Sequence, residues 1–112
     1  MQADDSFNQI AIPPSFVALY VPPGRIKPTE SRQTIAARYE FCEDLAQMLT
    51  ETAFNQLHGL HITETDVLER VSRGLTSPGA DTTAAEAQWI ITRLAELLNW
   101  PVLRAPDSEA PD

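Results

Sequence analysis

The stretch from residue 29 to residue 57, which contains neither glycine nor proline, constrains the fold most. Within it, apolar residues recur at steps of three and four, so they lie on one face of an α-helix. They are Ile35, Tyr39, Cys42, Leu45, Ala46, Leu49 and Ala53. The opposite face carries Glu40, Glu43, Asp44, Gln47 and Glu51. The pattern predicts a helix over about residues 31–57, capped by Thr29 or Ser31 and followed by a left-handed Gly59.

Two shorter helices follow. Thr63 and Asp66 have the spacing of a capping box and precede an apolar stripe, which predicts a helix over about 64–75. Thr83 and Glu86 form a full capping box and predict a helix over about 84–98, which ends at Asn99. Each helix is apolar on one side only, so the three must bury these sides against one another. The sequence therefore predicts an all-α fold, a three-helix bundle.

A proline-rich arm, residues 10–28, precedes the first helix and contains five of the nine prolines. Pro14 can open a short helix, but the β-branched and aromatic residues after it equally suit an extended segment. The arm is too short to fold alone. We expect it to pack on the bundle as an intramolecular clasp, with a partner-binding segment as the alternative. The candidate partner-binding residues are Phe16, Leu19, Tyr20 and Arg25.

The length of 112 residues suits one domain, which we expect to span residues 10–101. Residues 1–9 show no helix or strand period, and residues 102–112 form an acidic tail; both ends are predicted to be disordered. The acidic start does not resemble a secretory signal, and the longest apolar run, residues 16–21, is far shorter than the about 20 residues of a membrane span. We therefore expect a cytoplasmic protein without a membrane segment.

The charge balance argues against binding to polyanions. Sixteen Asp and Glu residues against eight Lys and Arg residues give a formal net charge of −8. Nucleic acids and anionic membranes are gripped through a basic field, which this chain lacks. The third predicted helix offers only Arg93, and the loop before it is longer than the turn of a helix-turn-helix. We expect no nucleic-acid partner and no membrane partner.

Nucleotide and thiol chemistry are both disfavoured. Gly74 and Gly79 have the spacing of a P-loop, but Ala80 and Asp81 follow where the motif needs Lys and then Ser or Thr. The single cysteine, Cys42, excludes an intramolecular disulfide and a cysteine-based zinc site. Its acidic neighbours, Glu43 and Asp44, disfavour a thiolate, which predicts a buried core thiol.

Two groups of ionisable residues are the remaining candidates for catalysis. His58 and His61, with Glu64 beyond them, supply ligand types that zinc accepts, but Gly59 places the histidines at a helix end with no common face. Glu40, Asp44 and Glu51 lie along one helical row among polar neighbours, which is typical of a solvated acidic face. We predict no catalytic residue, no metal site and no cofactor. A small enzyme that uses these carboxylates or histidines is the least favoured alternative.

Four stretches carry a family resemblance: Ile12–Arg25, Ala37–Leu49, Val67–Leu75 and Trp89–Pro101. Together they resemble a family of small uncharacterised betaproteobacterial proteins, some of which are described as an "ATPase with chaperone activity". The resemblance covers about residues 10–101 and implies a bacterial cytoplasmic protein. It transfers no catalytic residue, because this chain lacks the P-loop lysine and an acidic magnesium ligand after an apolar strand.

These observations predict a non-enzymatic interaction module or adaptor whose partner is another protein. A monomer is the favoured oligomeric state. An accessory subunit of a chaperone or ATPase machine, without a nucleotide site of its own, is the alternative that the resemblance implies.

Overall fold

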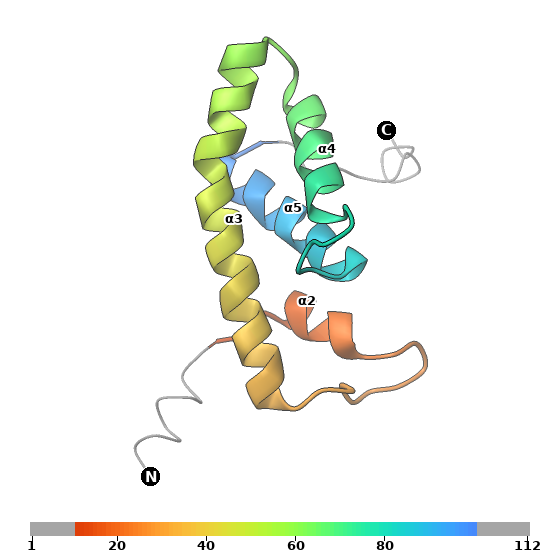
Figure 1. The fold of residues 1–112 in the computed structure, drawn as a ribbon. Helices are drawn as coiled ribbons and strands as arrows, with labels where there is room; N and C mark the ends of the chain where they lie inside the picture. Colours follow the sequence, from red (N-terminus) through yellow and green to blue (C-terminus); the bar gives the residue numbers. More distant parts are fainter. Residues whose placement is uncertain (1–10, 101–112) are drawn as a thin grey trace, which may run out of the picture. The chain divides into compact units, whose positions relative to one another are not determined.

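The computed structural model describes residues 11–100, so the predicted disordered ends, 1–9 and 102–112, lie outside the described residues. Within residues 11–100 the regular structure is helical, without a strand (Figure 1). The elements are α2 (Pro14–Val17), the 3₁₀-helix η1 (Ala18–Tyr20), α3 (Arg32–Leu60), α4 (Glu64–Leu75) and α5 (Ala84–Leu98). The predicted all-α class is confirmed.

The chain divides into two compact units within α3: an N-terminal unit, Met1–Cys42, and a C-terminal unit, Glu43–Asp112. Each unit is described by itself below. The single domain over residues 10–101 that the sequence suggested stays a prediction.

The C-terminal unit has an apolar core to which α3, α4 and α5 all contribute. Its buried residues are Ala53, Val67, Leu68, Val71, Ile91, Leu94 and Ala95. Leu49, Leu57, Ile62, Leu75, Leu98 and Trp100 pack against them from the edge of the core. Helices α4 and α5 lie side by side (Figure 1). Burial of each large aliphatic side chain contributes about 1.5–3 kcal/mol, so this shared core holds the three helical segments together.

The helix starts follow from local sequence. The Thr83 hydroxyl accepts a hydrogen bond from the Glu86 amide at 3.1 Å, and the Glu86 carboxylate accepts one from the Thr83 amide at 3.0 Å. Thr63 and Asp66 form the same pair of bonds at 3.0 and 3.3 Å. Both predicted capping boxes are confirmed. At the start of α3, the Ser31 hydroxyl accepts a hydrogen bond from the Thr34 amide.

The end of α3 differs from the prediction. Gly59 was expected to end the helix in a left-handed conformation, but α3 continues through it to Leu60. The left-handed residue is His61, with a φ of 56°. Ile62, the next residue, packs against the core of the C-terminal unit. The chain therefore reverses at His61, directly before the core residue Ile62, and not at Gly59, the residue with the greatest conformational freedom. At the end of α5, Asn99 is left-handed with a φ of 62°, as a helix C-cap requires.

In the N-terminal unit, residues 14–20 of the arm are helical rather than extended. Pro14 occupies the first turn of α2, and the amides of Phe16 and Val17 both donate to the Pro13 carbonyl. The Phe16 side chain is fully buried. Its ring lies 5.5 Å from that of Tyr20 and 5.6 Å from that of Tyr39 on α3. This aromatic cluster, Phe16, Tyr20 and Tyr39, packs the arm against the first turns of α3.

Candidate interaction surface

The chain between η1 and α3 forms a closed loop, residues 20–29. At its base, the Tyr20 carbonyl accepts hydrogen bonds from the Thr29 amide at 2.8 Å and from the Thr29 hydroxyl at 3.2 Å. At its far end, the Arg25 amide donates to the Pro22 carbonyl at 3.0 Å, and Gly24 has a φ of +79°. Proline followed by a left-handed glycine is typical of a type II turn. Backbone hydrogen bonds and proline rings therefore fix the conformation of this loop.

Residues 23–29 of the loop are all exposed, and the long side chains among them are those of Arg25, Ile26 and Lys27. We call these three residues the loop tip. Ile26 is 92% exposed, the highest value among the exposed large apolar side chains of residues 11–100. The Ile26 side chain is not buried within the protein, so it adds no hydrophobic stabilisation to the fold. Its burial against another surface would be favourable, because it would remove apolar area from water.

The four candidate partner-binding residues fall into two groups. Phe16 is buried and Tyr20 is half-buried, and both belong to the aromatic cluster. Leu19 is also half-buried. Arg25 is exposed in the loop tip. The structure therefore brings Phe16 and Tyr20 together within the fold of the N-terminal unit, and it leaves Arg25 accessible.

Ile26 is not among the four candidate partner-binding residues that the sequence suggested. The available signal was a single apolar residue between two basic ones in a proline-bounded turn. An isolated isoleucine in a sequence does not by itself indicate exposure, because most isoleucines are buried.

The candidate catalytic residues do not gather into a site. His58 and His61 are both exposed, and the His58 ring contacts the Phe54 ring in a tilted arrangement with 4.3 Å between ring centroids. Between residues 11 and 100, no three His, Cys, Asp or Glu side chains are placed to hold a metal ion. Glu40, Asp44 and Glu51 are exposed on α3. Cys42 is buried.

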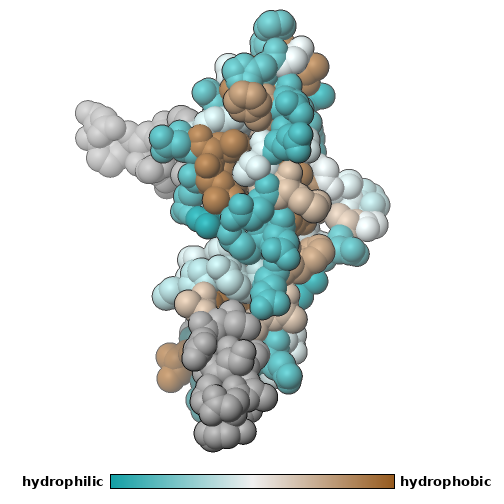
Figure 2. Space-filling model, turned by 90° about the vertical axis from the view of Figure 1, so that its left-hand side faces the viewer, coloured by the Kyte–Doolittle hydropathy of each residue, from teal (hydrophilic) through white to brown (hydrophobic). Residues whose placement is uncertain are grey.

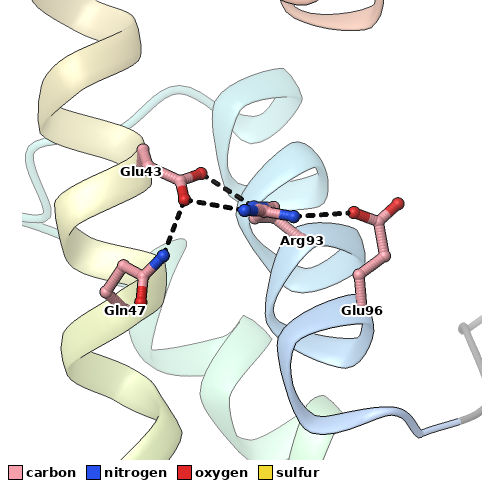
Figure 3. A network of polar contacts seen from close by, with 4 residues as sticks. All are labelled: Glu43, Gln47, Arg93 and Glu96. Carbon is pink, nitrogen blue, oxygen red and sulfur yellow. Dashed lines mark hydrogen bonds and ion pairs between the residues drawn. The ribbon is translucent and has the colours of Figure 1, made fainter.

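A polar network joins α3 to α5 within the C-terminal unit (Figure 3). Arg93 on α5 donates from Nε to Glu43 Oε1 at 2.8 Å and from Nη2 to Glu43 Oε2 at 3.0 Å. Gln47 donates to the same carboxylate at 2.8 Å, and Arg93 also reaches Glu96 at 3.2 Å. The hydrogen bond from Arg93 lowers the pKa of Glu43 below its ordinary value, although partial burial opposes this shift. The network serves the packing of the two helices.

Apolar side chains also lie on the surface outside the core. Figure 2 shows brown, hydrophobic side chains set among teal, hydrophilic ones. The large exposed apolar residues are Ile26, Phe41, Met48, Phe54 and Leu60. All of them except Ile26 belong to α3, and the Arg38 guanidinium lies over the Phe41 ring at 4.7 Å. By helical spacing, Phe41, Met48 and Phe54 lie on a side of α3 away from the core, whereas Leu60 follows the core side at the end of the helix.

No helix within residues 11–100 is both long enough and apolar enough to cross a membrane. No protein-family model, curated protein or solved structure matches this chain.

Proposed function

We propose that this protein is a non-enzymatic interaction module that binds another protein through the loop tip, Arg25–Lys27. The observation that carries the proposal is the 92% exposure of Ile26 on a loop closed by the two hydrogen bonds from Thr29 to Tyr20. Burial of one isoleucine against a partner contributes about 1.5–3 kcal/mol.

The fixed conformation of the loop supports this proposal. A contact segment that is already ordered loses little conformational entropy on binding, so more of the contact energy appears as affinity. Arg25 and Lys27 flank the apolar side chain and would set the orientation of the partner through charge. Phe16, Leu19 and Tyr20 act in this proposal as the support that holds the loop on α3, with Phe16 as the buried anchor.

The proposal places the protein in the cytoplasm as a monomer. The single cysteine is consistent with a reducing compartment, since Cys42 has no second cysteine in the chain with which to form a disulfide.

Affinity capture from the native cytoplasm tests this function. The baits are the tagged full chain, the double variant Arg25→Ser/Ile26→Ser, and Leu60→Ser, which changes another exposed apolar residue as a matched control. We expect one protein to be recovered stoichiometrically by the wild type and by Leu60→Ser but not by the loop variant. The purified pair should then reconstitute the complex. The same proteins on all three baits, or no partner on any, would overturn the proposal.

A second candidate function is an accessory subunit of a chaperone or ATPase machine. It rests on the family resemblance of residues 10–101 and places the nucleotide site in another chain. The same capture experiment distinguishes the two candidates. Recovery of an ATPase through the loop tip would favour the accessory subunit, whereas a partner without a nucleotide site would exclude it.

A further inference from the structure

The C-terminal part of α3 carries a row of five exposed side chains that belong neither to the core nor to the loop tip. The row consists of Asp44, Met48, Glu51, Phe54 and His58, and we call it the outer row of α3. Its spacing is four, three, three and four residues, so each side chain neighbours the next on one side of the helix. All five residues lie in the C-terminal unit, on a single continuous helix.

The outer row combines two apolar side chains with two carboxylates. Met48 is 68% exposed and Phe54 is 54% exposed. Glu51 lies between them in sequence, three residues from each, and Asp44 lies one turn before Met48. The Phe54 ring contacts the His58 ring in a tilted arrangement, with 4.3 Å between the centroids and 57° between the planes, and this contact restricts the orientation of the phenylalanine side chain. Methionine and aromatic residues are enriched where proteins contact one another, and methionine adapts to varied partners.

We infer that the outer row of α3 binds a basic amphipathic segment of another protein. In such a segment, Lys or Arg would face Glu51 and Asp44, while aliphatic residues three or four positions away would cover Met48 and Phe54. This recognition mode lays the apolar side of a helix against an exposed apolar strip. The net charge of −8 attracts a basic segment over longer distances and accelerates its encounter with the row.

The same charges disfavour two other occupants. A second copy of this chain, pairing through the same row, would bring carboxylates against carboxylates, and like charges in contact across an interface are costly. An anionic membrane would be repelled by the acidic row and by the net charge of the whole chain. A basic protein segment is the occupant that satisfies both the apolar and the acidic side chains.

This inference goes beyond the proposed function, because it concerns another unit, other residues and the opposite charge. The loop tip is basic and apolar, whereas the outer row is acidic and apolar. A protein with both surfaces can hold two different partners at once, which is what an adaptor does. Loss of either surface should leave binding at the other intact, so the two proposals can fail separately.

A peptide titration tests the inference. The probe is a fluorescent helical peptide of about 18 residues, roughly five helical turns, made of Lys and Leu in amphipathic order. A peptide with Glu in place of Lys is the charge control. Binding to the full-length protein is followed by fluorescence anisotropy and by amide chemical shifts in NMR spectra. We expect the Lys/Leu peptide to bind and to shift the amides of residues 44–58, while the Glu/Leu peptide does not bind.

Two matched pairs of variants distinguish peptide binding at the outer row from non-specific attraction of a basic peptide to an acidic protein. Glu51→Lys and Glu69→Lys change the net charge equally, and both residues are exposed on helices, but only Glu51 lies in the row. Met48→Gln/Phe54→Gln removes the apolar side chains of the row, and Leu60→Gln removes an exposed apolar residue outside it. We expect Glu51→Lys and Met48→Gln/Phe54→Gln to weaken binding about tenfold or more, as truncation at the centre of an interface does. Glu69→Lys and Leu60→Gln should each change affinity by less than about twofold.

Circular dichroism confirms that each variant is folded before its affinity is compared. Equal weakening by Glu51→Lys and Glu69→Lys would overturn the inference, because it would show general charge attraction alone. Shifts outside residues 44–58, or no binding of the Lys/Leu peptide, would overturn it as well.

Discussion

Arg93 and Glu43 form a bidentate pair, in which Nε and Nη2 of the guanidinium each donate to one oxygen of the carboxylate, at 2.8 and 3.0 Å. The two residues are 50 positions apart in the sequence and join α5 to α3 (Figure 3). Both side chains are partly shielded from water, with 17% of Glu43 and 32% of Arg93 exposed. Paired and bidentate geometry makes this contact stronger than an ordinary surface ion pair.

We predict that Glu43→Gln lowers the free energy of unfolding by about 1–2 kcal/mol at neutral pH. The amide cannot accept both hydrogen bonds from Arg93, and it removes the attraction between the two charges. Urea unfolding followed by circular dichroism measures the difference. Glu51→Gln, an exposed change on the same helix, is the control and should alter stability by less than about 0.5 kcal/mol. Equal effects of the two variants would show that the pair contributes nothing measurable.

The stabilisation by Glu43 should depend on pH in one direction. The hydrogen bond from Arg93 lowers the pKa of Glu43 in the folded protein below the ordinary value of 4.5. A carboxyl with a lowered folded pKa stabilises the protein above its unfolded pKa, and this contribution is lost as the pH falls through the folded value. The stability difference between wild type and Glu43→Gln should therefore be constant near neutral pH and shrink below about pH 4.5. A difference that grows on acidification would contradict the assignment.

The capping boxes make a second pair of stability predictions. Thr63→Ala and Thr83→Ala each remove the hydroxyl that accepts the amide hydrogen bond of the third helical residue, and each should cost about 1 kcal/mol. Thr52→Ala, an exposed change in the interior of α3, removes no cap and should leave stability unchanged or slightly raised. Thermal unfolding by circular dichroism ranks the three variants. A cap variant that unfolds at the same temperature as Thr52→Ala would show that its box is not formed in solution.

These features differ in how far the sequence predicts them, because they depend on contacts of different range. The capping boxes at Thr63 and Thr83 involve residues three positions apart, so the residue types alone identify them. The end of α3 does not follow from residue type, since the position of the reversal at His61 is set by where Ile62 reaches the core. Glycine at position 59 is compatible with a left-handed cap but does not require one.

The candidate surfaces depend on tertiary structure in the same way. The spacing of α3 places Glu43 on the polar, solvent-facing side of the helix. Its contact with Arg93 does not follow from the local sequence, because the two residues are 50 positions apart. Phe16 was a candidate for partner binding, and only its packing between Tyr20 and Tyr39 shows that it is buried. Arg25, the other outcome, is exposed at the end of the turn that its amide closes with the Pro22 carbonyl.

Phe16 should hold the arm on α3. Phe16→Ala removes a fully buried ring from the aromatic cluster, a change that costs about 3–5 kcal/mol where the cavity does not collapse. We expect the arm to open locally, so the Thr29 amide, which donates to the Tyr20 carbonyl, should exchange faster with deuterium. Hydrogen exchange followed by NMR measures this rate. Ile26→Ala, an exposed change in the same loop, should leave it unaltered, and an equally slow Thr29 amide in Phe16→Ala would show that the ring does not anchor the arm.

Two glycines should respond in opposite directions to the same substitution. A Cβ atom added at Gly24 or at Gly59 would meet no other atom within 4 Å, so neither change is limited by space. Gly59 is the penultimate residue of α3, where alanine is favoured over glycine by at most about 0.8–1 kcal/mol, so Gly59→Ala should stabilise the protein. Gly24 has a φ of +79°, a conformation that costs a residue with a Cβ atom about 1–2 kcal/mol, so Gly24→Ala should destabilise it. Urea unfolding of both variants beside the wild type measures the two shifts. A destabilised Gly59→Ala would mean that α3 ends before this residue in solution, with glycine in the left-handed cap.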